Sequence, residues 1–285
     1  MIDLSIIIVN RNNSKILQEC LGSIYKNTRK TALEIIVVDN NSSDGSQDMV
    51  KMFFPKVNLI RNEDNAGFSK ASNRGLKIFR GRYACLLNND TIIKESALDR
   101  MVEFMDRNAN VGACAPKLLN TDGTIQHQGS IFQKKFWMSQ IPVEITFAIA
   151  ACIMVRRETI NKVGLLDEKL FFYNEDLDWC KRIIKAGYKI FFVPESEVIH
   201  YGGYSSKNEF NKFIFVEGFR GGLYFVKKHY GNVVFSIYRA ILSCALVAFI
   251  PFFLLSYPLN PNKFKDRLFA YLEILKISTF GRKYL

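Results

Sequence analysis

Three carboxylates lie within four positions of one another, at Glu175, Asp176 and Asp178. The dipole of a helix favours acidic side chains in its first turn by about 0.3 to 1 kcal/mol each, and this accounts for one or two of the three. It does not account for the aromatic run at residues 171–173 directly before them. A carboxylate in a partly apolar pocket has a raised pKa, which suits it to accept a proton. The segment therefore predicts a general base.

Four polar clusters elsewhere in the chain each come directly after a β-rich run typical of a buried strand. Ligands in open α/β sheets bind outside the carboxyl ends of the strands, where such clusters meet. One cluster alone would mean little, but four outline a binding site. The clusters lie at residues 10–12, 39–44, 62–65 and 88–90.

The elements that position these clusters alternate over the first 120 residues between short β-rich runs and amphipathic stretches. Such alternation is typical of an α/β fold with a mostly parallel sheet covered by helices. The expected strands are Leu4–Asn10, Glu34–Asp39, Asn58–Arg61, Tyr83–Asn88 and Val111–Pro116. The expected helices are Ser14–Asn27, Ser46–Phe53, Phe68–Phe79 and Ser96–Arg107.

The pattern weakens from Leu119 to Pro142, which we interpret as a variable loop or lid. This stretch holds the aromatic residues Phe132, Phe136 and Trp137 in a basic setting. Regular structure is expected to resume after it. The expected segments are an apolar run at Ile145–Val155, helices at Glu158–Val163 and Glu175–Ala186, and strands at Lys189–Val193 and Glu197–His200.

In their order and spacing, these segments resemble the inverting family 2 glycosyltransferases of the GT-A fold, in particular the rhamnosyltransferase-like branch that builds bacterial surface polysaccharides. The resemblance covers about residues 4–205, and an ordered series of this length is specific. The matching segments are 5–12, 34–46, 65–68, 73–75, 86–91, 155–157, 173–178, 187–188 and 200–203. It implies a Rossmann-like GT-A domain with a mostly parallel central sheet and flanking helices.

The resemblance implies that Asp39 accepts a hydrogen bond from the uracil or thymine base of a nucleotide-sugar donor, in a pocket lined by Val9 and Arg11. The position of Asp39 at the carboxyl end of a strand supports a ligand-binding role. The alternative is a turn former or helix cap, a common role for Asp. Further contacts with the nucleotide-sugar are implied for Asn65, Gly67, Asn73, Asn88 and Asn89.

The segment Asn88–Asp90 stands where the resembling family has a metal motif of the D-x-D or N-x-D type. A divalent cation neutralises the charge that develops on a diphosphate leaving group. Only Asp90 is anionic here, so we expect the cation to bind donor phosphate oxygens as well as His200, which matches a metal-binding histidine of related enzymes. Oxygen ligands suit Mg²⁺ or Mn²⁺, and an imidazole favours Mn²⁺. A hydrogen-bonded strand-end histidine stays the alternative for His200.

Inversion at an anomeric carbon requires a base that deprotonates the acceptor hydroxyl on the face opposite the leaving nucleotide. The resemblance assigns this role to Asp176. Glu175 and Asp178 are supporting candidates.

Residues Ala240–Tyr257 carry no charged side chain, and as a helix they would be about 27 Å long, just short of the ~30 Å hydrocarbon core of a bilayer. Pro251 is expected to kink this helix. Residues 227–285 hold nine Lys and Arg against two Asp and Glu, so much of the net charge of +12 lies here. A buried core helix is one reading, but the basic flanks favour docking on an anionic membrane surface or a re-entrant segment.

The rest of the composition excludes several classes of protein. The six cysteines are spread along the chain without a C-x-x-C pair, so we expect them to be reduced core residues of a cytosolic protein. The N-terminus lacks the basic region of a signal peptide. The motifs of P-loop NTPases, dinucleotide dehydrogenases, zincins and α/β-hydrolases are missing. We expect no nucleic-acid partner, because the charge of the tail adjoins an apolar helix and not an aromatic stacking platform.

We therefore expect a GT-A domain over residues 1–225 and a basic, apolar helical segment over residues 226–285, peripheral on the cytoplasmic face of the cell membrane. The expected reaction is the metal-assisted, inverting transfer of one sugar to a hydroxyl group of a glycan or lipid-linked glycan. The first candidate for the sugar is L-rhamnose, with dTDP-rhamnose as the donor. A UDP-linked galactofuranose, N-acetylglucosamine or glucose donor and a non-catalytic nucleotide-sugar-binding subunit stay open. A sugar nucleotidyltransferase is disfavoured, because no G-x-G-[ST]-R loop lies near the first strand.

Overall fold

The computed structural model describes residues 1–128, 134–202, 210–255 and 261–280, without the side chains of 252–255 and 261–264. The chain divides into two compact units. Unit 1 comprises Met1–Glu168 and Asp176–Tyr204, and unit 2 comprises Lys169–Glu175 and Ser205–Leu285. The boundary expected at residue 225 falls within a helix of unit 2.

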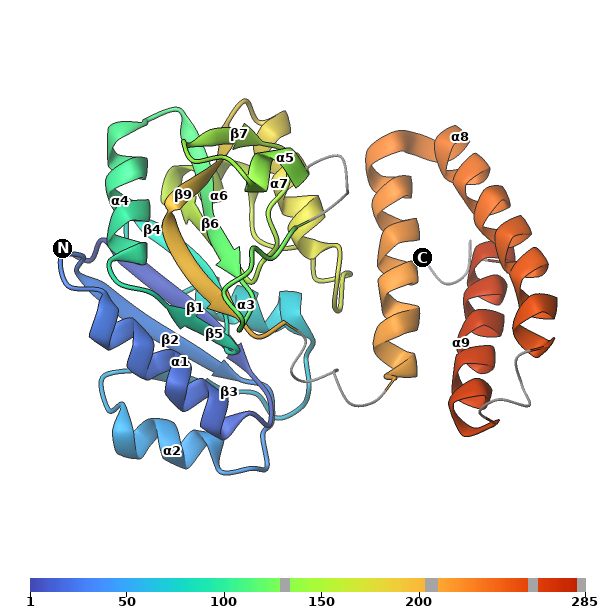
Figure 1. The fold of residues 1–285 in the computed structure, drawn as a ribbon, viewed down its shortest axis with the longest axis horizontal. Helices are drawn as coiled ribbons and strands as arrows, with labels where there is room; N and C mark the ends of the chain where they lie inside the picture. Colours follow the sequence, from blue (N-terminus) through green and yellow to red (C-terminus); the bar gives the residue numbers. More distant parts are fainter. Residues whose placement is uncertain (129–133, 203–209, 256–260, 281–285) are drawn as a thin grey trace. The chain divides into compact units, whose positions relative to one another are not determined.

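Unit 1 is built on one mixed sheet, with strand order β3-β2-β1-β4-β8-β6-β9-β5 and with β7 paired to β9 (Figure 1). The first four of these strands pair in parallel, whereas β8 is antiparallel to both β4 and β6. The strands are β1 (Leu4–Asn10), β2 (Leu33–Asp39), β3 (Asn58–Arg61), β4 (Tyr83–Asn88), β5 (Thr91–Ile93), β6 (Val111–Leu119), β7 (Val143–Ile145), β8 (Cys152–Arg156) and β9 (Lys189–His200).

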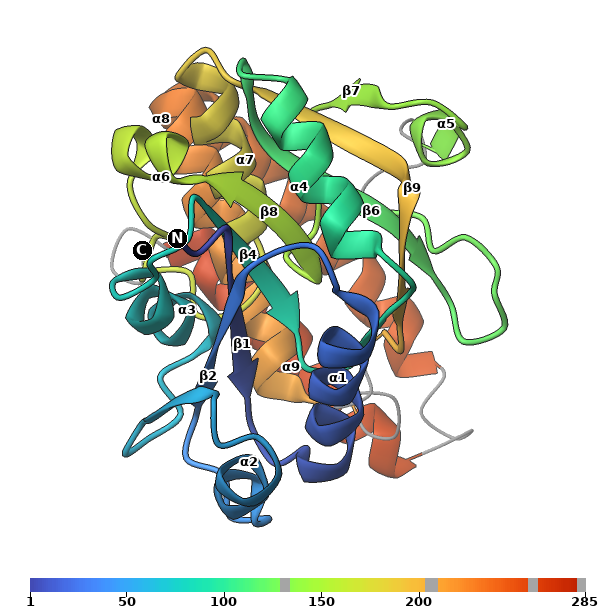
Figure 2. The ribbon, with the colours of Figure 1, turned by 90° about the vertical axis from the view of Figure 1, so that its left-hand side faces the viewer.

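Helices cover both faces of the sheet (Figure 2). Residues of α1 (Ser14–Asn27), α2 (Ser46–Phe53) and α4 (Ala97–Arg107) pack into the core on one face. Residues of α3 (Phe68–Leu76), α6 (Arg157–Val163) and α7 (Glu175–Lys185) pack into the core on the other, beside the short helix α5 (Lys134–Trp137).

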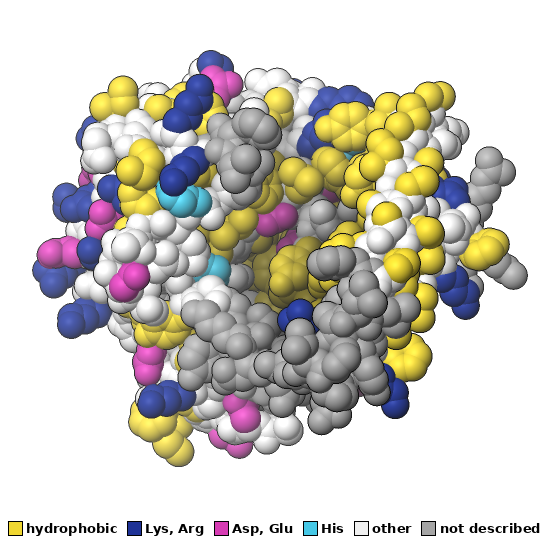
Figure 3. Space-filling view, turned by 45° about the vertical axis from the view of Figure 1, so that its right-hand side comes forward, with side chains coloured by type: hydrophobic (Ala, Val, Ile, Leu, Met, Phe, Trp, Pro, Cys, Tyr) yellow, Lys and Arg dark blue, Asp and Glu magenta, His cyan; other side chains and the backbone are white. Residues whose placement is uncertain are grey.

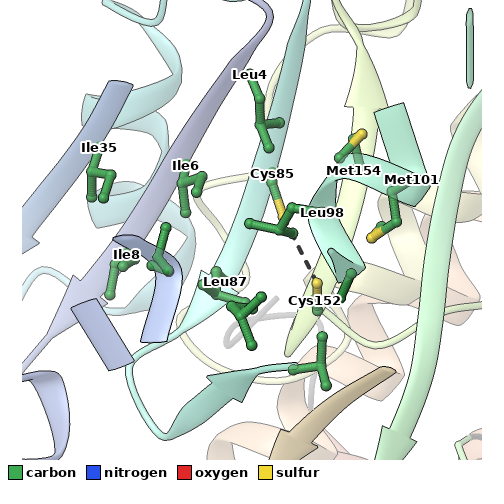
Figure 4. Packing of buried hydrophobic residues seen from close by; sticks show 14 of the residues in the cluster. Leu4, Ile6, Ile8, Ile35, Cys85, Leu87, Leu98, Met101, Cys152 and Met154 are labelled. Atoms are coloured by element: carbon green, nitrogen blue, oxygen red, sulfur yellow. Dashed lines mark hydrogen bonds between the residues drawn. The ribbon is translucent and has the colours of Figure 1, made fainter. Parts of the chain in front are cut away.

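The sequence explains this layered arrangement. In α1, residues 16, 17, 20, 21 and 24 are buried, which is the spacing of one apolar helix face. The central strands β1 and β4 are apolar at nearly every position, as expected where helices cover both sides of a parallel sheet. Figure 4 shows part of the core on one face of the sheet, where the thiol of Cys85 on β4 lies beside that of Cys152 on β8, with the sulfur atoms 3.8 Å apart and no disulfide.

The register of the sheet gathers the polar clusters at one edge. Asn10 pairs with Asp39, and Asp39 pairs with Arg61, so β1, β2 and β3 end together. Asn88 at the end of β4 is paired with Val9. The edge strand β5 then pairs Thr91 with His200.

Unit 2 contains α8 (Lys212–Leu255) and α9 (Pro261–Phe280). Gly231, with φ of 78°, interrupts α8 and divides it into two helical parts. Arg239 in the second part donates to the carbonyl oxygens of Ser278 (2.6 Å) and Thr279 (2.6 Å) near the end of α9. All three helical parts contribute to one small core, formed by Val216, Leu223, Phe235, Leu246, Ala270, Ile274 and Ile277.

Most of the expected elements are confirmed, and several differences have physical causes. The strand β9 runs continuously through Pro194, because its register against β6 shifts there and accommodates the missing N–H. Within the expected lid, Trp137 is a core residue whose ring lies 5.2 Å from that of Phe192, and Phe132 lies outside the described residues. Cys244 is exposed on α8, unlike the other five cysteines. The interruption of α8 lies at Gly231, and Pro251 sits within its second part.

Candidate active site

Asp39 is almost fully buried at the end of β2, and three donors hold its carboxylate. Ser42 N (2.9 Å) and Gln47 Nε2 (2.7 Å) donate to Oδ1, and Asn10 Nδ2 (3.1 Å) donates to Oδ2. Asp39 therefore shapes the loop after β2, as the turn-forming reading expected. Each carboxylate oxygen has two lone pairs, so Oδ2 retains acceptor capacity. Beside this loop Val9 is half-buried and Arg11 is exposed.

A second set of amides fixes the loops after β2 and β3. Asn40 donates to Asn65 Oδ1 (3.2 Å) and to the carbonyl oxygen of Gly67 (3.2 Å), and it accepts from Asn62 Nδ2 (2.6 Å). Gly67 has φ of 78° and precedes α3, whose first N–H groups have no side-chain cap. The N-terminus of a helix suits an anionic ligand such as a diphosphate, because the helix dipole favours negative charge there.

Asn73 is buried and bound within the chain. Its Nδ2 donates to the carbonyl oxygen of Leu166 (2.9 Å) and to Glu168 Oε1 (3.0 Å), and its Oδ1 accepts from Leu166 N (3.0 Å). These bonds tie α3 to the loop at 166–168. The assigned contact between Asn73 and a nucleotide-sugar remains a prediction.

The loop after β4 brings Asp90 next to His200. Oδ1 of Asp90 is 3.3 Å from Nε2 of His200, and both residues are more than nine-tenths buried. The pairing of β5 with β9 fixes this approach, because Tyr201 N also donates to the carbonyl oxygen of Asp90 (2.9 Å). Asn88 Nδ2 lies 3.3 Å from the same imidazole nitrogen, and Asn89 Nδ2 donates to Asn10 Oδ1 (2.8 Å).

The hydrogen bonds of Gln126 assign the protonation of the His200 ring. Gln126 Nε2 faces two acceptors, Asn120 Oδ1 (3.1 Å) and the carbonyl oxygen of His200 (3.5 Å). Its Oε1 therefore faces Nδ1 of His200 at 2.6 Å and accepts the proton there. In the neutral ring this leaves a lone pair on Nε2, directed toward the carboxylate of Asp90.

This arrangement fits a divalent cation. The carboxylate of Asp90 and the imidazole of His200 lie 3.3 Å apart, and a carboxylate with an imidazole is a donor set for Mn²⁺. Rotation of the Asn88 amide would add an oxygen ligand. Within the described ranges no cluster of three or more His, Cys, Asp or Glu side chains could hold a metal ion. The remaining ligands would come from the diphosphate of a bound nucleotide.

Asp176, in the first turn of α7, lies close to the end of β4. Ala150 N donates to Asp176 Oδ2 (3.3 Å), and the carbonyl oxygen of the next residue, Ala151, accepts from Asn88 N (2.9 Å). Burial raises the pKa of Asp176 to about 6, against the opposing effect of hydrogen bonds from the N–H groups of Leu177 and Ala150. A carboxylate with this pKa is ionised at neutral pH and is still basic enough to accept a proton from a hydroxyl group.

The two supporting acids have different surroundings. Asp178 is fully buried and accepts from Arg182 Nε (2.8 Å), and Arg182 also donates to the carbonyl oxygens of Val163 (2.6 Å) and Leu165 (2.8 Å). Asp178 thus helps to fix α7 against the loop at 163–165. Glu175 is buried as the last residue of the first segment of unit 2.

The backbone directly before these acids is strained. Tyr173 and Asn174 have φ of 69° and 68°, in the left-handed region that few residues other than glycine adopt. Asn174 Nδ2 donates to the carbonyl oxygen of Gly218 in α8 (2.9 Å), which holds this conformation within unit 2. Strain of this kind persists where the surrounding structure enforces it, and it is common at functional sites.

Sequence reasoning missed three residues that organise this site. Asn10 connects the loops after β1, β2 and β4, Asn40 connects those after β2 and β3, and Gln126 orients His200. The positions of Asn10 and Asn40 at strand ends were a signal for the first two. Gln126 carried no signal, because its contact with His200 joins segments 74 residues apart.

The chain matches a known protein family. The model described as "Glycosyl transferase family 2" matches residues 5–164. An N-acetylglucosaminyl-diphospho-decaprenol L-rhamnosyltransferase of Mycobacterium tuberculosis is 23% identical over 67% of this chain and 73% of its own length. A dTDP-rhamnosyl transferase of Shigella flexneri, RfbF, is 24% identical over 63% of this chain and 64% of its own length. An uncharacterized protein of Sinorhizobium fredii, y4gI, is 28% identical over 72% of this chain, which matches only 25% of the length of that protein.

Solved structures share the fold. The mannosyltransferase PcManGT from Pyrobaculum calidifontis, in complex with GDP-Man and Mn²⁺, aligns with 98% of this chain and 87% of its own, at a TM-score of 0.64 and 15% identity. GalNAc-T7, with UDP, GalNAc and Mn²⁺, aligns with 80% of this chain and 48% of its own, at a TM-score of 0.63 and 18% identity. The expected GT-A α/β fold is thereby confirmed.

Proposed function

Because the chain belongs to glycosyl transferase family 2 and is similar to rhamnosyltransferases, we propose that it transfers one sugar, with inversion, from a nucleotide diphosphate donor to a hydroxyl group of a glycan. One observation carries the proposal: Asp90 approaches His200 beside Asn88 at the end of β4, and Asp176 accepts from Ala150 N, next to the Ala151 carbonyl that Asn88 N contacts. We also propose that this glycan is part of a bacterial surface polysaccharide and that the acceptor is lipid-linked, because the relative of Mycobacterium tuberculosis is named for N-acetylglucosaminyl-diphospho-decaprenol.

The proposed roles follow from the contacts. Asp39, with Val9 and Arg11, would bind the nucleobase, and the segment with Asn65 and Gly67 would line the donor. The cation held by Asp90 and His200 would neutralise the charge developing on the diphosphate as it leaves. Asp176 would remove the proton of the acceptor hydroxyl, since its raised pKa and its position near the end of β4 suit a base.

For the donor we propose dTDP-L-rhamnose first, because RfbF is named for that class of donor. UDP-linked galactofuranose, N-acetylglucosamine and glucose are the alternatives. Uracil and thymine present the same N–H and carbonyl edge to Asp39, so this carboxylate does not discriminate between dTDP and UDP. Adenine has no ring N–H on the corresponding edge, and guanine is a larger purine, so ADP and GDP are expected to bind more weakly.

Calorimetric titration of the purified full chain with dTDP, UDP, GDP and ADP, each with Mn²⁺ and with EDTA, tests the donor site. We expect dTDP or UDP to bind in the presence of Mn²⁺, and Asp90→Ala to abolish the effect of the metal. Glu95→Ala is the matched control, because Glu95 is an exposed acid just beyond β5. A folded wild-type protein that binds none of the four nucleotides would contradict the proposal, whereas nucleotide binding without sugar transfer would favour the non-catalytic nucleotide-sugar-binding subunit.

Transfer itself is tested with dTDP-rhamnose and the three UDP-sugars on a diphospholipid-linked N-acetylglucosamine acceptor. The anomeric configuration of the product, read from its NMR coupling constants, should be opposite to that of the donor. Retention of configuration would contradict the role of Asp176. The nucleotide-binding result above would be unaffected.

A further inference from the structure

The second part of α8, after Gly231, exposes apolar side chains around most of its circumference. Val233 is 75% exposed, Ile237 56%, Ile241 64%, Val247 58% and Phe249 44%. Between residues 232 and 251, Arg239 is the one charged residue. We call the exposed side chains of this part the α8 outer face. Figure 3 shows hydrophobic side chains in a band along unit 2, with Lys and Arg side chains beside it.

The opposite side of the same helix packs within unit 2. Phe235 and Leu246 are buried, and with Arg239 and Leu242 they form a narrow stripe at helical spacing that contacts the core with α9. Only this stripe of the helix is therefore used for packing within unit 2. The α8 outer face is left uncovered by the described residues of unit 2, and an apolar surface of this extent marks an interaction site.

The charge of unit 2 identifies the partner. Residues 205–285 contain twelve Lys and Arg against four Asp and Glu, a net charge of +8 of the total +12. Exposed cations lie on α9 at Lys265, Arg267 and Lys276. An uncharged apolar face with cations on neighbouring surfaces complements a bilayer of anionic lipids, where the apolar side chains enter the acyl boundary and the cations contact phosphate groups.

We propose that the α8 outer face docks unit 2 on an anionic lipid bilayer, with the second part of α8 lying in the plane of the interface. By its length and composition, Lys212–Pro251 could also cross a membrane. The packed stripe joins this helix to α9, which carries Lys265, Asp266, Arg267 and Lys276 as exposed side chains. If the second part of α8 crossed the bilayer, these charged side chains would enter the hydrocarbon with it. On membrane-insertion scales, the free-energy cost of one Asp, Lys or Arg near the bilayer centre is about 2.5 to 3.5 kcal/mol.

Sedimentation of the full chain with vesicles tests the surface. We expect binding to phosphatidylglycerol-containing vesicles and much weaker binding to pure phosphatidylcholine vesicles. The double variant Ile237→Asp/Ile241→Asp should reduce binding to the anionic vesicles about tenfold or more, because each exposed isoleucine loses its apolar burial in the bilayer. Ile78→Asp is the matched control, since Ile78 is an isoleucine 43% exposed in unit 1. Equal binding by the double variant and wild type would overturn the proposal.

A second variant keeps the test independent of folding defects. Ile241→Trp preserves an apolar side chain, and its fluorescence should shift to the blue with anionic vesicles and be quenched by lipids brominated near the headgroup end of the acyl chain. The two native tryptophans, Trp137 and Trp179, are 1% exposed and give a constant background. Ile78→Trp should show no shift. An unshifted Ile241→Trp spectrum would count against the proposal.

The remaining outcomes decide between modes and partners. Release of bound protein by alkaline carbonate supports interfacial docking, whereas resistance to extraction would overturn it in favour of a crossing helix. Concentration-dependent dimers in lipid-free buffer that Ile237→Asp/Ile241→Asp abolishes would instead assign the α8 outer face to a second copy of the chain. None of these measurements depends on sugar transfer. Their outcome therefore tests membrane docking independently of the proposed function.

Discussion

At the level of single residues, the ionisation of Asp176 makes the proposed mechanism measurable. A base must be ionised to accept a proton, and burial raises the pKa of Asp176 to about 6. The rate of transfer, kcat/KM, should therefore fall tenfold per pH unit below about pH 6 and be flat above it. Asp176→Asn should lower kcat by about 10² to 10⁴-fold while Mn²⁺-dependent nucleotide binding is retained. Unchanged transfer by this variant would exclude the assigned base.

The same pKa predicts how stability depends on pH. The folded chain binds a proton at Asp176 more tightly than the unfolded chain does, because the pKa is raised from 3.8 to about 6. Stability from this residue is thus fully present below pH 3.8 and is lost as the pH rises through 6. As the pH rises from 3.8 through 6, the free energy of unfolding of Asp176→Asn should therefore increase relative to that of the wild type, by on the order of 2 to 3 kcal/mol.

Urea unfolding at pH 4 and pH 7.5 measures this difference. Tryptophan fluorescence follows unit 1 alone, since Trp137 and Trp179 are the two tryptophans of the chain and both belong to that unit. Asp64→Asn, at an exposed acid in the loop after β3, is the control and should show the same pH dependence as the wild type. Parallel behaviour of Asp176→Asn and wild type would contradict the burial of this carboxylate.

Gln126 should control metal affinity without being a ligand. Its Oε1 accepts from Nδ1 of His200 at 2.6 Å, which fixes the ring and leaves Nε2 directed toward Asp90. Residues that orient a ligand in this way are worth about 10 to 100-fold in metal affinity. Gln126→Leu should weaken Mn²⁺ binding in the presence of dTDP or UDP by this factor, measured from the electron paramagnetic resonance signal of free Mn²⁺. Gln140→Leu, at an exposed glutamine, should not change it.

Which site residues the sequence could predict depends on how they are held. Asp39, Asp90 and Asp176 carry formal charge and occur in short motifs, so their types and positions made them candidates. Asn10 and Gln126 are neutral amides whose roles depend on hydrogen bonds to residues 29 and 74 positions away. The strand-end position of Asn10 marked it as part of a polar cluster, but nothing local in the sequence identifies the distant residues to which Asn10 and Gln126 bind.

At the level of elements, two adjacent glycines in α8 allow a sharp test of how the strained segment is held. A Cβ atom at Gly221 would lie 2.9 Å from Asn174 Nδ2 and 3.2 Å from Leu170 Cδ2. At Gly222 the nearest atoms would be 3.9 Å away, an ordinary contact. Alanine stabilises a helix interior by about 1 kcal/mol relative to glycine at either position. The two substitutions therefore differ mainly in whether they displace the segment at 170–174.

Gly221→Ala should lower kcat/KM by about 10 to 100-fold, because it moves the residues directly before the proposed base, and small misplacements of catalytic groups are costly. Gly222→Ala should keep wild-type activity and raise the melting temperature. Both quantities are measured on the same preparations. Equal activity of the two variants would show that the close approach at Gly221 does not matter for transfer.

The elements also show what sequence patterns can and cannot predict. Strands such as β1 and β4, and helices such as α1, were predicted to the residue because apolar periodicity and flanking polar clusters mark both ends. Strand β5 was missed because Thr91–Ile93 is three residues long and is defined by its pairing with β9. The break at Gly231 was missed as well, because a single glycine inside a helical pattern is tolerated and does not by itself mark the end of a helix.

At the level of the whole molecule, the proposed catalytic residues and most of the positive charge belong to different units. Unit 1 contains Asp39, Asp90, His200 and Asp176, and unit 2 contains most of the positive charge and the α8 outer face. A docking surface in a different unit from the proposed catalytic residues would raise the local concentration of an acceptor embedded in the same bilayer. It leaves the chemical step unchanged, so the two units should affect different kinetic constants.

This separation gives a prediction that combines the proposed function with the docking surface. With a long-chain polyprenyl-diphosphate acceptor in anionic vesicles, Ile237→Asp/Ile241→Asp should raise the acceptor KM about tenfold or more and leave kcat unchanged, because only encounter at the membrane is weakened. With a short-chain, water-soluble acceptor, the variant and wild type should have the same KM and kcat. Added salt should raise the KM of the wild type for the vesicle acceptor by screening the cations of unit 2. Equal losses with both acceptors would mean that these isoleucines support the fold of unit 2 and not its encounter with lipid.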